Sequence, residues 1–172
     1  SKATIAGNAS SISLNSKCLD RIDAHRANRR RCHRDDCGYD EYSKRSFDHR
    51  KAWVQDRLRF LAETFALEVV THSVMSNHFH VILRTRPDLA KRWEAAEVAR
   101  RWRLIFPKGK KNDHAEAALC RNAKRIEELR GRLSDLSWFM RCLDEYIARM
   151  ANAGDGVPGR IWEGRFKSQV LL

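Results

Sequence analysis

The sequence lacks any long apolar run. No stretch of about 18 consecutive apolar residues, the length a membrane-spanning helix needs, occurs in its 172 residues. Its first residues, Ser1-Lys2 followed by small polar side chains, lack the apolar core of a secretory signal peptide. Cysteine occurs five times, an odd number at irregular spacings, which fits reduced thiols better than a disulfide framework. We therefore expect a cytoplasmic protein with no membrane partner.

A paired set of zinc ligands is also missing. Cys32-His33 and Cys37 lie close together in the sequence, but their spacing fits no common zinc pattern. No second pair of ligands follows at a suitable distance. We therefore expect no zinc site in this stretch.

Acidic residues are too few to balance the basic ones. The chain has 34 Lys and Arg against 22 Asp and Glu, a formal net charge of +12, and 42% of its residues are hydrophobic. The length and the hydrophobic content predict one domain with a substantial core. The excess of positive charge favours nucleic acid over an acidic membrane, because neutralising phosphates releases condensed counterions. Charge alone also fits a ribosome-associated or merely soluble basic protein.

Apolar periodicity divides the chain into two parts. Residues 1–36 are expected to be a basic, poorly ordered segment, because 24–36 have no apolar periodicity beyond Ala24 and Ala27. Residues 37–172 form the predicted domain. Apolar residues at 4-3-4 spacing predict helices at 49–66 (capped by Asp48), 90–106, 114–132 and 134–152, with a strand pair at 67–84. The basic connection at 107–112 fits either a solvated loop or a phosphate contact.

The most informative motif is Ser76-Asn77-His78-Phe79-His80, between two apolar runs that predict two strands or one bent strand. Side chains alternate along a strand, so His78 and His80 share a face about 6.6 Å apart while Phe79 enters the core. Two such imidazoles can converge on one cation, although a half-exposed pair needs no ligand. His72 is a weaker candidate ligand, because the polar break at 76–77 leaves its face undetermined.

Three segments in this order resemble the IS200-like single-tyrosine transposases, which carry a histidine–hydrophobic–histidine (HUH) motif. The resemblance is strongest to the branch called REP-associated tyrosine transposases. The segments are Val74–Val81, Trp138–Arg141 and Trp162–Ser168. The stretch from Asp40 to Arg50 is similar to the family's first loop and helix start. The resemblance covers roughly residues 37–172.

The resemblance implies an α+β fold, a ferredoxin-like sandwich with an antiparallel sheet and several packed helices. It also implies that His78 and His80 ligate a divalent cation, Mg²⁺ or Mn²⁺, which polarises a scissile phosphate. In this family a tyrosine attacks the phosphorus of single-stranded hairpin DNA and forms a 5′-phosphotyrosine link. We therefore expect a transposase domain that binds such DNA. The expected oligomeric state is either a monomer or a homodimer. The predicted DNA contacts are Arg84, Arg160, Trp162, Arg165 and Lys167.

Two departures from the family pattern limit the expected activity. The family's nucleophile lies in a Tyr-x-x-x-Asn-Pro context beyond the Trp162–Ser168 segment, and that context does not occur before Leu172. Among the three tyrosines, Tyr146 matches a non-catalytic position, and Tyr39 and Tyr42 lie in the N-terminal loop. We therefore expect a domain truncated at its C-terminus that does not cleave alone.

The second departure is the family's first strand, which is not recognisable in residues 17–36 and is expected to be lost. The alternative function is a non-catalytic nucleic-acid-binding module that uses only its basic surface.

Overall fold

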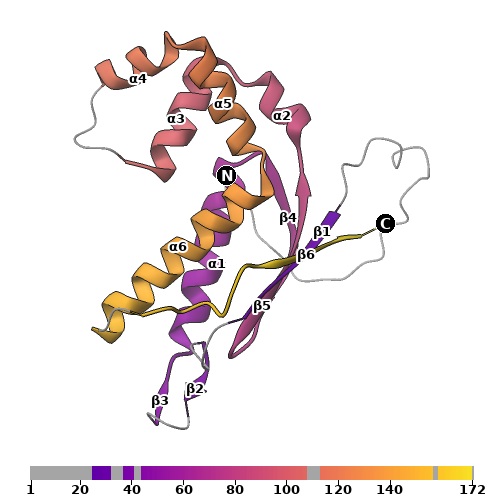
Figure 1. Cartoon of the computed structure of the whole chain (residues 1–172), viewed down its shortest axis with the longest axis vertical. Coiled ribbons are helices and arrows are strands. Elements are labelled where there is room, and N and C mark those ends of the chain that lie inside the picture. Colours follow the sequence, from indigo (N-terminus) through magenta and orange to yellow (C-terminus); the bar gives the residue numbers. More distant parts are fainter. Residues whose placement is uncertain (1–24, 32–36, 41–43, 108–112, 157–158, 172) are drawn as a thin grey trace, which may run out of the picture.

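A computed structural model describes residues 25–31, 37–40, 44–107, 113–156 and 159–171 (Figure 1). In this part of the chain, four strands form an antiparallel sheet in the order β4-β5-β1-β6. The strands are β1 (His25–Arg31), β4 (Leu67–Val74), β5 (His78–Thr85) and β6 (Lys167–Leu171). Helices α1 (His49–Thr64) and α6 (Leu136–Asp155) connect them in a βαββαβ sequence. This strand order and connectivity are ferredoxin-like, so the predicted α+β fold is confirmed.

The expectation that the first strand is lost was wrong. β1 lies between β5 and β6 and pairs antiparallel with both. Its sequence, His-Arg-Ala-Asn-Arg-Arg-Arg, has no alternating apolar residues. Strands are recognised by hydrophobicity of period two, so no pattern in this segment could reveal the strand. Backbone pairing with both neighbours defines it. The rest of the segment predicted to be poorly ordered, with Cys32 and His33, lies outside the described residues.

One face of the sheet carries the core. Helices α1 and α6 pack side by side on this face (Figure 1). Phe79, Val81 and Leu83 of β5 point into the same cluster of buried side chains. The helices contribute the stripes that their 4-3-4 spacing predicted, with Val54, Leu58 and Leu61 from α1 and Leu136, Met140, Leu143 and Ile147 from α6.

Asp48 precedes α1 as predicted, but its side chain does not cap the helix backbone. It accepts hydrogen bonds from Ser46 Oγ at 2.9 Å and Lys51 Nζ at 2.7 Å. These contacts lower the pKa of the Asp48 carboxyl, chiefly through the hydrogen bond from Lys51. A small hairpin of β2 (Tyr39–Asp40) and β3 (Arg45–Ser46) lies immediately before the helix.

Four shorter helices, here called the helical lobe, lie between β5 and α6 in the chain. They are α2 (Pro87–Arg92), α3 (Ala95–Ile105), α4 (Asp113–Cys120) and α5 (Ala123–Leu133). Each of the two helices predicted here is broken once, at 93–94 and at 121–122. The second break has a local cause, because the Asn122 side chain accepts a hydrogen bond from the Arg125 backbone N–H at 3.0 Å and starts a new helix. The basic residues at 108–112 lie outside the described residues.

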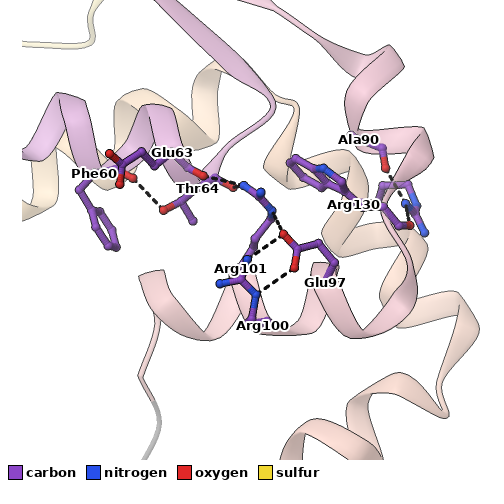
Figure 2. Close-up of polar contacts among 9 residues, drawn as sticks. Phe60, Glu63, Thr64, Ala90, Glu97, Arg100, Arg101 and Arg130 are labelled. Carbon is purple, nitrogen blue, oxygen red and sulfur yellow. Dashed lines mark hydrogen bonds and ion pairs between the residues drawn. The ribbon is translucent and has the colours of Figure 1, made fainter. Parts of the chain in front are cut away.

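Arg101 joins the helical lobe to α1, and Arg130 joins two helices within the lobe (Figure 2). Arg101 Nη1 on α3 donates to the carbonyl oxygens of Glu63 at 2.6 Å and Thr64 at 3.0 Å, at the end of α1. Arg130 Nη1 on α5 donates to the carbonyl oxygens of Ala90 and Trp93 at 2.5 Å each, at the end of α2. The last carbonyls of a helix lack partners in a following turn, and these guanidinium groups donate to them; Ala90 also accepts from the Trp93 backbone N–H at 3.2 Å. Among the described residues, no helix is both long enough and apolar enough to cross a membrane.

Candidate metal and nucleic-acid site

A tight hairpin turn sets the positions of the two histidines. β4 and β5 pair antiparallel, with Val74 opposite Phe79 and Ser73 opposite His80. At the turn the Met75 backbone N–H donates to the His78 carbonyl oxygen at 2.8 Å. The predicted pair of apolar runs is therefore two separate strands, and the polar residues at 76–77 form the loop between them.

His78 and His80 lie together on the face of β5 that points away from the core. Phe79, between them, is 2% exposed and packs in the core, whereas both histidines are half-buried. Their ring centroids are 5.2 Å apart with an interplanar angle of 84°. With metal–nitrogen bonds of about 2.1 Å, two imidazoles that share one cation have centroids roughly 4.5 to 6.4 Å apart. The observed separation fits a shared cation.

Asn77 sets the tautomer of His78. Its Oδ1 atom lies 2.6 Å from His78 Nδ1. A carbonyl oxygen only accepts hydrogen bonds, so His78 Nδ1 carries the proton and donates it. The lone pair of the imidazole is then on Nε2, the atom that would bind a metal. A histidine that binds a metal through one ring nitrogen usually donates a hydrogen bond of this kind from the other, which fixes its tautomer and orientation.

His72 does not belong to this site. It lies opposite Val81, which is fully buried, and it lines a pocket of about 500 Å³ between α1 and β4. Residues directly opposite each other in a sheet share a face, so His72 is on the face opposite to His78 and His80. Within the described residues, no group of three or more His, Cys, Asp or Glu side chains converges. Water and other oxygen ligands would complete the coordination of a bound cation, as is usual for Mg²⁺.

The sheet register places a basic side chain in the row of His80. Lys167 on β6 lies opposite Arg29 on β1, and Arg29 lies opposite His80 on β5. Since opposite residues share a face and adjacent strands are about 4.8 Å apart, the Lys167 backbone lies about 10 Å from that of His80, on the same face. Lys167 is exposed.

The predicted DNA contacts separate into three environments. Arg160, Arg165 and Lys167 are exposed and, within the described part of the chain, none of them forms an ion pair. Arg84 is half-buried and pairs with Glu68, at 3.4 Å between Nη1 and Oε2. Residues 160–171 are called the C-terminal segment below.

Trp162, predicted as a DNA contact, lies in the core. It is 7% exposed, packs edge-on against Phe79 with ring centroids 5.9 Å apart, and donates from Nε1 to the Asp144 carbonyl oxygen at 3.0 Å. It therefore cannot present a ring face to solvent. Trp162 therefore supports β5, the strand of the histidine pair, from the core side of the sheet.

A pocket of about 670 Å³ lies between α6 and the C-terminal segment, and Trp162 is among the residues that line it. Arg165 and Phe166 line it on one side, and Arg141 and Glu145 of α6 line the other. Arg141 Nε donates to Glu145 Oε1 at 2.7 Å, and this contact raises the pKa of Arg141. An aromatic wall with guanidinium groups at the rim suits a flat ring that carries phosphate.

The described tyrosines do not lie beside the histidines in the chain or in the sheet. Tyr146 on α6 is half-buried beneath Arg57, whose Cζ lies 4.5 Å from the ring centroid. Tyr39 is 51% exposed and belongs to β2, so it is in a short strand where a loop was expected. Tyr42 lies outside the described residues.

Sequence reasoning missed two contributors to this site. In the sequence Asn77 is part of a polar break, although an amide next to a candidate histidine ligand is a signal for tautomer control. Arg141 belongs to the Trp138–Arg141 segment, but the sequence does not show that α6 faces the C-terminal segment, so its place in a pocket could not be predicted.

No protein-family model matches the chain, and no curated protein matches it.

Proposed function

We propose that this chain is the DNA- and metal-binding part of a DNA strand-transfer domain of the IS200-like single-tyrosine type, and that it does not cleave DNA alone. It would bind single-stranded hairpin DNA through the C-terminal segment and a divalent cation through His78 and His80. The observation that carries the proposal is the arrangement of the sheet, in which the histidine pair and the exposed Lys167 share one face of a ferredoxin-like fold.

The donor set suits a cation that works on phosphate. Two imidazole nitrogens leave most coordination positions to oxygen ligands, and Mg²⁺ and Mn²⁺ favour oxygen. When bound, such a cation would supply Lewis-acid polarisation of the scissile phosphodiester. The protein's own part is to hold both ring nitrogens in place: β5 sets their spacing and Asn77 sets the tautomer of His78.

The C-terminal segment supplies the nucleic-acid surface. Arg160, Arg165 and Lys167 are available because none is paired within the described chain. Lys167 would contact a phosphate close to the cation, and Arg165 would hold one at the pocket rim. An unpaired base of a single strand would then enter the pocket and stack on Phe166.

Metal binding tests the first half of the proposal. Mn²⁺ affinity is measured by calorimetry or electron paramagnetic resonance for the wild-type chain and for His78→Ala/His80→Ala. We expect the double variant to lose Mn²⁺ binding and to keep most of its DNA affinity. His72→Ala is the matched control, since it removes a histidine from the opposite face. Equal Mn²⁺ binding by the double variant would show the assignment to be wrong.

Incubation with a 3′-labelled single-stranded hairpin and Mn²⁺ tests the second half. A covalent adduct supports strand transfer, and mass spectrometry locates the tyrosine that carries the DNA. Salt-sensitive binding without an adduct is also expected of a chain that does not cleave alone, and it supports the alternative, a non-catalytic nucleic-acid-binding module, if the wild-type chain binds no Mn²⁺ either. The absence of any binding at low salt contradicts both functions.

A further inference from the structure

The β2–β3 hairpin is docked on the turn that precedes the histidine pair. At its base the Cys37 backbone N–H donates to the Ser76 carbonyl oxygen at 2.7 Å. The Phe47 backbone N–H in turn donates to the Gly38 carbonyl oxygen at 2.7 Å. The two ends of the hairpin are therefore tied to each other and to the β4–β5 turn.

Gly38 allows the hairpin to lie this close to the turn at Ser76. A Cβ atom at position 38 would lie 2.5 Å from Ser76 Cβ and 3.2 Å from Ser76 Cα. Carbon atoms in favourable contact are about 3.5 to 4.0 Å apart, so any side chain here would force the two backbones to separate. The glycine is needed for close approach of two backbone segments.

The hairpin is also held from its other side, so it cannot easily retreat. Phe47 is 9% exposed, and the guanidinium carbon of Arg50 lies 4.1 Å from the centroid of its ring. Arg50 is itself 2% exposed and forms an ion pair with Asp155 at the end of α6. An added Cβ at position 38 would therefore move the Ser76 turn more readily than the hairpin.

We infer that Gly38 is a positioning residue for His78. Its contact with Ser76 holds the neighbouring Asn77 where Oδ1 accepts the proton of His78 Nδ1, 2.6 Å away. Displacement of the turn breaks that hydrogen bond, so the His78 imidazole is no longer held in the Nδ1–H tautomer. The consequence for metal affinity rests on the proposed function, but the consequence for the tautomer does not.

The experiment compares Gly38→Ala with Gly131→Ala, a control position where an added Cβ meets nothing within 4 Å. Nitrogen-15 NMR of the imidazole rings reports which nitrogen of His78 is protonated, and calorimetry reports Mn²⁺ affinity. We expect Gly38→Ala to lose the Nδ1–H tautomer and to bind Mn²⁺ roughly 10- to 100-fold more weakly, the usual loss when an outer hydrogen bond to a metal ligand is removed. The control should match the wild type in both.

A second substitution separates positioning from general damage. Gly38→Ala/Ser76→Gly removes the atom of the 2.5 Å contact, so it should recover the tautomer and the affinity. Should Gly38→Ala fail to fold, Asn77→Ala keeps the Gly38 contact and must reproduce the tautomer loss.

The inference is overturned if either single variant, Gly38→Ala or Asn77→Ala, retains the wild-type Nδ1–H tautomer. It is also overturned if the wild-type chain lacks that tautomer. If the tautomer responds as expected but the wild-type chain binds no Mn²⁺, the inference stands and the proposed metal function fails.

Discussion

Arg101 and Arg130 of the helical lobe each add one positive charge to the net charge of +12, as do Arg165 and Lys167 of the C-terminal segment, but the environments of the two pairs are opposite. Arg101 donates hydrogen bonds to the last carbonyls of α1, and Arg130 donates hydrogen bonds to carbonyls at the end of α2. Arg165 and Lys167 are exposed, with no ion pair in the described chain. Net charge therefore overstates the surface available to a polyanion. The first pair should control folding and the second pair should control binding.

Arg130→Ala should give the largest effect. The substitution removes the Arg130 donor from the Trp93 carbonyl and leaves the Ala90 carbonyl with only the Trp93 backbone N–H, at 3.2 Å, and the Arg130 side chain is only 15% exposed. We expect a loss of about 3 kcal/mol in the free energy of unfolding, measured by urea denaturation. Arg160→Ala, at an exposed position, should change it by less than about 0.5 kcal/mol. Similar losses from both substitutions would remove the distinction between the two regions.

Lys167→Ala and Arg165→Ala should weaken DNA binding without affecting stability. Each removes about one phosphate contact, so the slope of log K against log salt for single-stranded DNA should fall by about 0.7. Fluorescence anisotropy over a salt series measures the slope. Arg100→Ala serves as the control, because Arg100 already forms an ion pair with Glu97 at 2.8 Å. Unchanged slopes for both variants would return the C-terminal segment to a purely structural role.

Arg101→Lys should have a smaller effect on stability, and it distinguishes shape from charge. Arg101 donates to Glu63 and Thr64 carbonyls and, from Nε at 2.6 Å, to Glu97, while its guanidinium lies 4.2 Å from the Trp93 ring centroid. Lysine keeps the charge but cannot make these contacts together. We expect a loss of about 1 kcal/mol in chemical denaturation. A variant as stable as the wild type would show that charge alone is sufficient here.

The smallest effect on the free energy of unfolding comes from Cys142, at the interface of α1 and α6. Burial raises the pKa of the Cys142 thiol to about 11 from its usual value near 9, although Arg57 opposes the shift. The unfolded chain therefore loses this proton first as pH rises. Stability is unaffected by this group below about pH 9 and falls as pH increases towards 11, by about 1 kcal/mol near pH 9.5. Denaturation of wild type and Cys142→Ala at pH 8 and 9.5 measures the difference, which disappears if the thiol titrates normally.

The sequence predicted elements that bury an apolar stripe. Regular spacing in α1 and α6 and alternation in β5 were sufficient, and the common face of His78 and His80 followed from the same alternation. β1 was missed because its seven residues carry no apolar period, and only its neighbours define it. The face of His72 could not be predicted, since a two-residue loop places even positions of one strand opposite odd positions of the other. The burial of Trp162 depends on its contact with Phe79, which local sequence cannot show.

The central place of β1 has a consequence for how the molecule forms. β1 and β6 are neighbours in the sheet, with His25 opposite Leu171. The two strands lie side by side in space although most of the chain lies between them in the sequence. Pairs so distant in sequence close late, because the entropy of a long loop must be overcome before their hydrogen bonds form. The hairpin of β4 and β5, closed by a short turn, can form early. Joining Lys167 to the row of His80 should therefore be among the last steps of folding, so the face that holds both residues is complete only in the fully folded chain.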